Sequence, residues 1–167
     1  GRLATKNFMG SASEIPKITS VTINDFQDNN TVLINYTGIG DHEFSLDGKT
    51  FQYNPYFTNV QVGEYNATVK NQCGTDAEKI YVLNYPRFFS PNGDNNNDIW
   101  EIKNLDQLLN ANVQIFDKYG KFIYQFNSKT KGWDGKLNSQ NLPSTDYWFV
   151  ITLENNKIIK GHFSIKR

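Results

Sequence analysis

The residues best suited to chemistry lie in one polar stretch near the middle of the chain. Its residues are Pro91, Asn92 and Gly93, followed by Asp94-Asn95-Asn96-Asn97-Asp98. Asp94, Asn96 and Asp98 place side-chain oxygens at alternate positions, as the first three ligands of a calcium loop do. A full calcium loop also needs a glycine after the third ligand and a distal glutamate, but Ile99 stands at the glycine position and Glu101 is too close. Two interpretations follow: a calcium site, or Asx turns in which the side chains cap their own backbone.

Other residue types raise the question of catalysis. Two aspartate pairs, Asp94 with Asp98 and Asp134 with Asp146, have the chemistry of a glycoside hydrolase. All four lie in sequences typical of turns, where aspartate commonly forms the turn. His42 and His162 lie in different halves of the chain, without a nucleophile motif or metal-ligand spacing nearby. The sequence therefore predicts a protein that is not an enzyme.

Tryptophans offer a different kind of site. Trp100, Trp133 and Trp148, together with several tyrosines, could include a flat platform on which a sugar stacks. Trp133 is the best candidate, because Gly132 and Gly135 flank it closely. The other interpretation is that Trp133 anchors a hydrophobic core. A carbohydrate-binding or adhesive module is therefore the alternative function.

Composition limits the class of protein. The chain has 167 residues, of which 38% are hydrophobic, 20% charged and 14% aromatic, as expected of a folded, strand-rich protein. Residues 1–84 carry six Lys and Arg against nine Asp and Glu, and residues 85–167 carry eleven against eight. That asymmetry is too mild to predict a nucleic-acid partner. No apolar run predicts a direct membrane span, and Cys73, the single cysteine, predicts neither a disulfide nor a cysteine metal site.

The order of elements predicts an all-β chain of two tandem small antiparallel β-sandwich modules of immunoglobulin-like type. Residues 1–16 are expected to be a flexible lead-in or a cloning remnant, and the start at Gly1 suggests a piece of a longer protein. Residues 17–84 alternate polar and apolar residues between turn signals, as the strands of a sandwich do. A proline-containing linker then leads to the second module, residues 85–167. Tyr147–Leu153 is nearly continuously apolar and predicts a central strand buried on both faces.

Five motifs follow one another in the second module. They are Phe88–Asp94 with Asn97–Trp100, Val113–Lys121, Gly132-Trp133-Asp134-Gly135, Leu142–Ser144 with Asp146–Phe149, and Lys160–Arg167. In this order they resemble the gliding-motility-associated C-terminal domain of Bacteroidota, the type B sorting domain of the type IX secretion system. Asn95, Ser139 and Thr145 depart from the family, which has glycine at these positions.

The resemblance implies that the second module is a sorting signal. Such a domain directs its passenger through the type IX translocon to the cell surface or medium and stays attached, with an outer-membrane barrel of the SprF/PorP kind as partner. Residues 17–84 resemble the surface-adhesin repeats of gliding bacteria at Glu43–Gly48 and Val62–Val69, and would be the last passenger repeat. Because an unpaired strand edge can dock a partner, we expect the terminal strand to contribute to recognition. Its candidate cations are Lys157, Lys160, Lys166 and Arg167.

Overall fold

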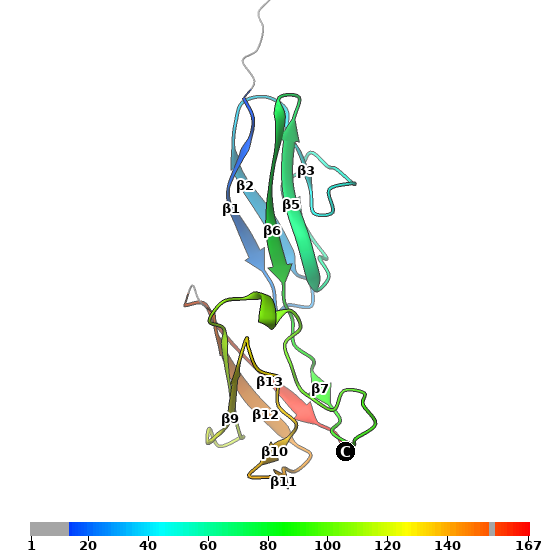
Figure 1. Ribbon diagram of the computed structural model, residues 1–167, viewed down its shortest axis with the longest axis vertical. Coiled ribbons are helices and arrows are strands. Elements are labelled where there is room, and N and C mark those ends of the chain that lie inside the picture. The colour runs from blue at the N-terminus through cyan, green and yellow to red at the C-terminus, as the bar shows by residue number, and fades with distance from the viewer. Residues whose placement is uncertain (1–13, 154–155) are drawn as a thin grey trace, which may run out of the picture. The chain divides into compact units, whose positions relative to one another are not determined.

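The computed structural model describes residues 14–153 and 156–167 and is all-β, as the sequence predicts (Figure 1). Most of the predicted lead-in lies outside the described residues. The one helical element in the described ranges is a single 3₁₀ turn, η1 (Leu105–Gln107). The chain forms two compact units. Unit 1 takes in the described residues up to Asn24 together with 29–60 and 64–80, and unit 2 takes in 25–28, 61–63 and 81–167.

Unit 1 is a sandwich of two three-stranded sheets, ordered β1-β2-β4 and β3-β5-β6. The strands are β1 (Lys17–Asn24), β2 (Thr31–Thr37), β3 (Glu43–Ser45), β4 (Tyr56–Phe57), β5 (Gly63–Asn71) and β6 (Gly74–Val82). Alternation on β2 buries Val32 and Ile34, while Phe44 and Val69 are buried from the other sheet. Each sheet thus turns one apolar face inward, the pattern of an immunoglobulin-like sandwich.

Unit 2 is built on a five-stranded sheet ordered β7-β13-β12-β8-β9. Its strands are β7 (Phe88–Phe89), β8 (Asn112–Phe116), β9 (Phe122–Asn127), β12 (Asp146–Thr152) and β13 (Ile158–Ile165). All neighbours are antiparallel except β7, which runs parallel to the end of β13. The sequence interpretation placed the terminal strand at an unpaired edge. β7 covers that edge only at Ser164 and Ile165, and it does not extend along Ile158–Phe163. The edge strands are β7 and β9.

The layer facing this sheet is short. It consists of the hairpin of β10 (Lys136–Leu137) and β11 (Gln140–Asn141) and of an isolated antiparallel bridge between Trp100 and Trp133. The backbone N–H of each tryptophan donates to the carbonyl of the other, at 2.8 and 2.9 Å. Strand pairing between Trp100 and Trp133 is thus limited to one bridge.

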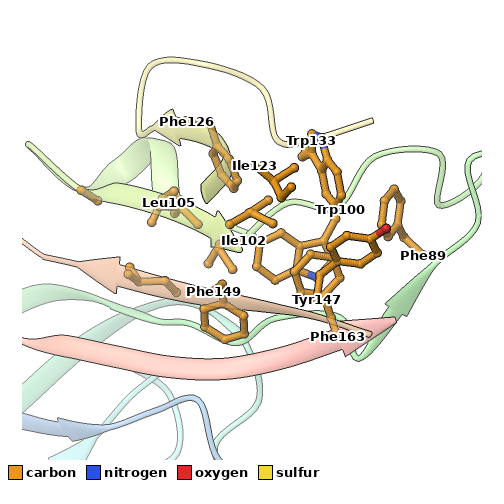
Figure 2. Packing of buried hydrophobic residues seen from close by; sticks show 14 of the residues in the cluster. Phe89, Trp100, Ile102, Leu105, Ile123, Phe126, Trp133, Tyr147, Phe149 and Phe163 are labelled. Atoms are coloured by element: carbon orange, nitrogen blue, oxygen red, sulfur yellow. The ribbon is translucent and has the colours of Figure 1, made fainter. Parts of the chain in front are cut away.

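Aromatic side chains fill the space between the two layers of unit 2 (Figure 2). The rings of Trp100 and Phe163 stack with centroids 3.9 Å apart, and Trp133 meets Tyr147 edge to face at 5.1 Å. Trp100 and Trp133 have no exposed surface. The interpretation of Trp133 as a core anchor is therefore confirmed, and its use as a stacking platform for a ligand is wrong.

Strand β12 corrects a second expectation. It is central in the sheet, but Tyr147, Phe149 and Ile151 are buried while Trp148 on the opposite face is 41% exposed. The sequence predicted burial on both faces. The buried face is the one that packs on the core under the β10–β11 hairpin and the Trp100–Trp133 bridge.

Candidate functional site

The motif loop between β7 and Trp100 is held together by the carboxylate of Asp98. Its Oδ1 accepts the backbone N–H groups of Asn92 and Gly93 at 2.9 and 2.7 Å. Its Oδ2 accepts the N–H of Asn95 at 2.8 Å. These bonds lower the pKa of Asp98 below its usual value, the bond from Gly93 being the largest cause, because they stabilise the charged form.

A second set of bonds closes the start of the loop. Asp94 Oδ1 accepts the N–H of Asn96 at 2.8 Å, and Asp94 Oδ2 accepts Nδ2 of Asn92 at 2.9 Å. In return, Asn92 Oδ1 accepts the N–H of Asp94 at 3.0 Å. Bonds between side chains and nearby N–H groups are those of Asx turns. The loop geometry therefore favours the second of the two sequence interpretations.

Calcium at this loop stays a prediction. Asp94, Asn96 and Asp98 would be its ligands, and the carboxylate oxygens of both aspartates already accept hydrogen bonds within the loop. Across the described ranges, no group of three or more His, Cys, Asp or Glu side chains is arranged to hold a metal. Calorimetric titration of the whole chain with calcium tests the site, and absence of heat would leave the Asx turns as the explanation.

The left-handed positions of the motif loop explain one departure from the family. Gly93 has a φ of 84°, Asn95 of 65° and Asn97 of 53°. Asparagine tolerates this region better than most residues do. Asn95 therefore takes the conformation for which the family uses glycine.

The motif Gly132-Trp133-Asp134-Gly135 positions the short layer of unit 2. A Cβ on Gly132 would lie 2.0 Å from the carbonyl oxygen of Trp100, so only glycine permits the bridge. Trp133 Nε1 donates to the Lys136 carbonyl at 2.8 Å. Asp134 accepts the Lys136 N–H at 3.1 Å and pairs with its ammonium at 3.3 Å. Gly132, Trp133 and Asp134 thus each have a structural role in the motif.

Gly135 completes that motif. Its φ is +77°, and a Cβ there would lie 3.2 Å from the ring of Phe89 and 3.3 Å from Nη2 of Arg167. Arg167 donates to the carbonyls of Leu142 and Gly135. Arg167 therefore fastens the segment after β13 to the residues that flank the β10–β11 hairpin.

The four candidate recognition cations do not form one cluster of free charges. Lys157 pairs with the nearly buried Asp25 of the same unit at 2.9 Å. Lys166 Nζ lies 4.1 Å from the ring centroid of Phe88. Arg167 binds backbone carbonyls, and Lys160 is exposed on β13. Contact between Lys160 and a partner is therefore sterically straightforward, whereas Lys157 and Arg167 have contacts within unit 2.

The candidate catalytic residues are also dispersed. His42 is buried beside the ring of Tyr36 in unit 1, whereas His162 is exposed on β13 of unit 2. Asp146 accepts a hydrogen bond from the hydroxyl of Ser164. His42 and His162 lie beside aromatic rings, those of Tyr36 and Trp148. The aspartates have turn-forming or strand-pairing contacts.

Unit 2 matches a known protein family. Residues 83–165 match the CHU_C Type IX secretion signal domain. The match supports a sorting role for unit 2 in a protein secreted by the type IX system, and it implies export across the outer membrane. The resemblance predicted for residues 86–167 is confirmed at this level. No helix in the described part of the chain has the length and apolar character needed to cross a bilayer.

Two solved structures are distantly similar to the chain. No curated protein matches the chain. Dimeric latent PorU from Porphyromonas gingivalis is 14% identical with a TM-score of 0.31, and the match covers 98% of this chain and 21% of that one. Tp47, the 47-kilodalton lipoprotein of Treponema pallidum, is 9% identical with a TM-score of 0.32, over 90% and 50%. The chain thus spans at most half of these structures, and TM-scores this low carry no argument.

Proposed function

We propose that unit 2 is a non-catalytic sorting signal that takes its passenger through the type IX translocon and holds it at the cell surface. The observation that carries the proposal is the match of residues 83–165 to a type IX secretion signal domain. The motifs of that region also fix its fold: Gly132 permits the tryptophan bridge, and Asp98 organises the motif loop. Attachment after export would use an outer-membrane barrel of the SprF/PorP kind.

Unit 1 would be the last passenger repeat of an adhesin-like surface protein. Its two three-stranded sheets form a self-contained sandwich with its own buried residues, among them Val32, Phe44 and Val69. A repeat of this kind contributes length or a binding surface and no chemistry. The proposal includes a gliding bacterium of the Bacteroidota as its source, on the sequence resemblance alone.

The alternative, a carbohydrate-binding module, has lost its main support. Trp133, its best candidate for stacking, is fully buried, and so is Trp100. Trp148 is the tryptophan that still reaches solvent. No cluster of aromatic and hydrogen-bonding groups around Trp133 is open to a sugar, and sorting is the better supported function.

The test is export of a fluorescent reporter placed upstream of residues 1–167, in a gliding bacterium with and without a working translocon. The whole chain is used because Leu83, before the predicted second module, belongs to the core of unit 2. We expect surface fluorescence that depends on the translocon and on residues 81–167. Equal surface display without the translocon, or after removal of residues 81–167, would overturn the proposal.

A further inference from the structure

The outer face of the five-stranded sheet in unit 2 carries an aromatic row. Cross-strand pairing places His162 on β13 opposite Trp148 on β12, Trp148 opposite Phe116 on β8, and Phe116 opposite Phe122 on β9. The ring centroids of His162 and Trp148 are 6.1 Å apart, as are those of Phe116 and Phe122. One line of rings therefore crosses four strands.

This row lies on the side of the sheet that faces away from the core. The neighbours of Trp148 on its strand, Tyr147 and Phe149, are buried, while Trp148 is 41% exposed and Phe122 is 50% exposed. Two further apolar side chains, Phe88 and Ile158, are exposed at alternating positions of the same face. A solvated sheet face normally carries polar residues, and a patch of exposed apolar side chains marks an interaction site.

Charges on this face are unevenly distributed. Lys160 is exposed on β13, two residues from His162, and Lys166 covers Phe88 at the adjoining edge. The one carboxylate at an outward position of β12, Asp146, accepts the hydroxyl of Ser164. The outward positions of β8 and β9 hold amides and aromatic rings without charge. The complementary surface is therefore apolar opposite Trp148 and Phe122, and acidic opposite Lys160 and Lys166.

We propose that this face is where unit 2 binds a protein of the export machinery, one that presents an apolar patch bordered by carboxylates. The inference rests on the proposed function. A protein fits better than a sugar, because the row runs from Trp148 through Phe116 to Phe122 with no hydrogen-bonding group between these rings. Exposed tryptophan surrounded by apolar groups is also typical of the centre of a protein interface. Lys160, among the cations predicted from the sequence, lies at its border.

The test uses the full-length reporter chain and two sets of changes. The double variant Trp148→Thr/Phe122→Thr removes the centre of the row and keeps residues that suit strands. Lys160→Glu/Lys166→Glu reverses the charge at its border, and Lys160→Arg/Lys166→Arg is the matched control. Tyr119→Ser, at an 84% exposed position in the turn before β9, controls for loss of an exposed aromatic ring.

We expect surface display to fall at least about tenfold in the threonine and glutamate variants, with folded protein retained in the periplasm. Both control variants should be displayed as the unchanged chain is. Thermal unfolding of the purified variants, followed by circular dichroism, must show that they are folded; Phe122→Thr alone replaces the double variant if it is not.

Several results would overturn the inference. Normal display of the folded threonine and glutamate variants would remove the face from recognition, while the unchanged chain would still establish the sorting function. Failure of the unchanged chain to depend on the translocon would instead reject the sorting function. Sedimentation showing a dimer that Trp148→Thr dissolves would assign the face to a second copy, and binding of a polysaccharide lost in the same variant would assign it to a glycan.

Discussion

The two units close their cores in different ways. Unit 1 has three strands in each of its two sheets, so hydrogen-bond ladders hold both layers. In unit 2 the layer opposite the five-stranded sheet consists of a hairpin whose two strands have two residues each, and of one bridge between Trp100 and Trp133. Contacts between large aromatic rings hold this layer of unit 2 in place, whereas backbone hydrogen bonds between strands hold both layers of unit 1. The stability of unit 2 should therefore depend on few residues, and because all three tryptophans lie in it, tryptophan fluorescence reports its unfolding selectively.

Replacing a tryptophan of the bridge should lower the stability of unit 2 more than any other change considered. Trp133→Ala removes a fully buried ring and the bond from its Nε1 to Lys136, and we expect a loss of about 3–5 kcal/mol in the free energy of unfolding. Denaturant titration followed by circular dichroism measures it. The matched control is Trp148→Ala on the outer face, which should cost less than about 1 kcal/mol. Equal losses in the two variants would contradict the account of the core.

Adding a single methyl group to the bridge should cost nearly as much. The Cβ of Gly132→Ala would lie 2.0 Å from a backbone oxygen, so the bridge must open, and we expect about 2–3 kcal/mol of destabilisation. In unit 1, a Cβ on Gly74 would meet side-chain atoms of Ile15 at 3.1 Å, which can move aside. Gly74→Ala should leave the fluorescence-detected transition unchanged. A Gly132→Ala variant as stable as the unchanged chain would show that the bridge is dispensable.

Each unit has a loop held together by one aspartate, so the pH dependence of stability can be compared between the two units. Thr50 N–H is the main cause of the lowered pKa of Asp47, as Gly93 N–H is for Asp98. A carboxyl with a lowered folded-state pKa stabilises the protein above its unfolded value of about 3.8, and this contribution disappears as pH falls through the folded value.

Asp98→Asn should therefore lower the unfolding temperature of unit 2 at pH 7, by less than Trp133→Ala does. The difference from the unchanged chain should shrink as the pH falls below about 3.8, because protonated Asp98 no longer accepts all three bonds. Thermal unfolding monitored by tryptophan fluorescence at several pH values measures it. Asp47→Asn, in unit 1, is the control and should leave this signal unchanged; a pH-independent effect of Asp98→Asn would contradict the assignment.

The smallest expected effect is a gain. Asn138 and Ser139 form the two-residue turn between β10 and β11 with φ values of 51° and 65°. Serine is strained in this region, whereas glycine is not. Ser139→Gly should stabilise unit 2 by up to about 1 kcal/mol, because relief of about 1–2 kcal/mol of left-handed strain exceeds the entropy cost of glycine, about 0.5–1 kcal/mol. Denaturant titration measures the gain. Asn138→Gly should gain less, because asparagine tolerates positive φ; the reverse order would contradict the turn assignment.

Sequence reasoning succeeded where chemistry is local. The alternation of polar and apolar residues over residues 17–84 predicted the strands of unit 1, because it depends on each strand's own residues. The order of the five motifs likewise predicts the type IX secretion signal domain that residues 83–165 match, since a motif needs only its own residues. The all-β architecture and the match of residues 83–165 to a type IX secretion signal domain could thus be predicted from the sequence alone.

Tertiary structure decided which surfaces those strands show. A run such as Tyr147–Leu153 is equally apolar whether one face or two are covered, and only the packing of the sheet buries Tyr147 and Phe149 while Trp148 stays exposed. The sequence around Trp133 is compatible with an exposed or a buried ring, and the tertiary structure buries it. Of the four candidate cations, Lys157 and Arg167 have partners that lie far away in the sequence. Burial and pairing depend on residues brought together from distant parts of the chain, so no local pattern can fix them.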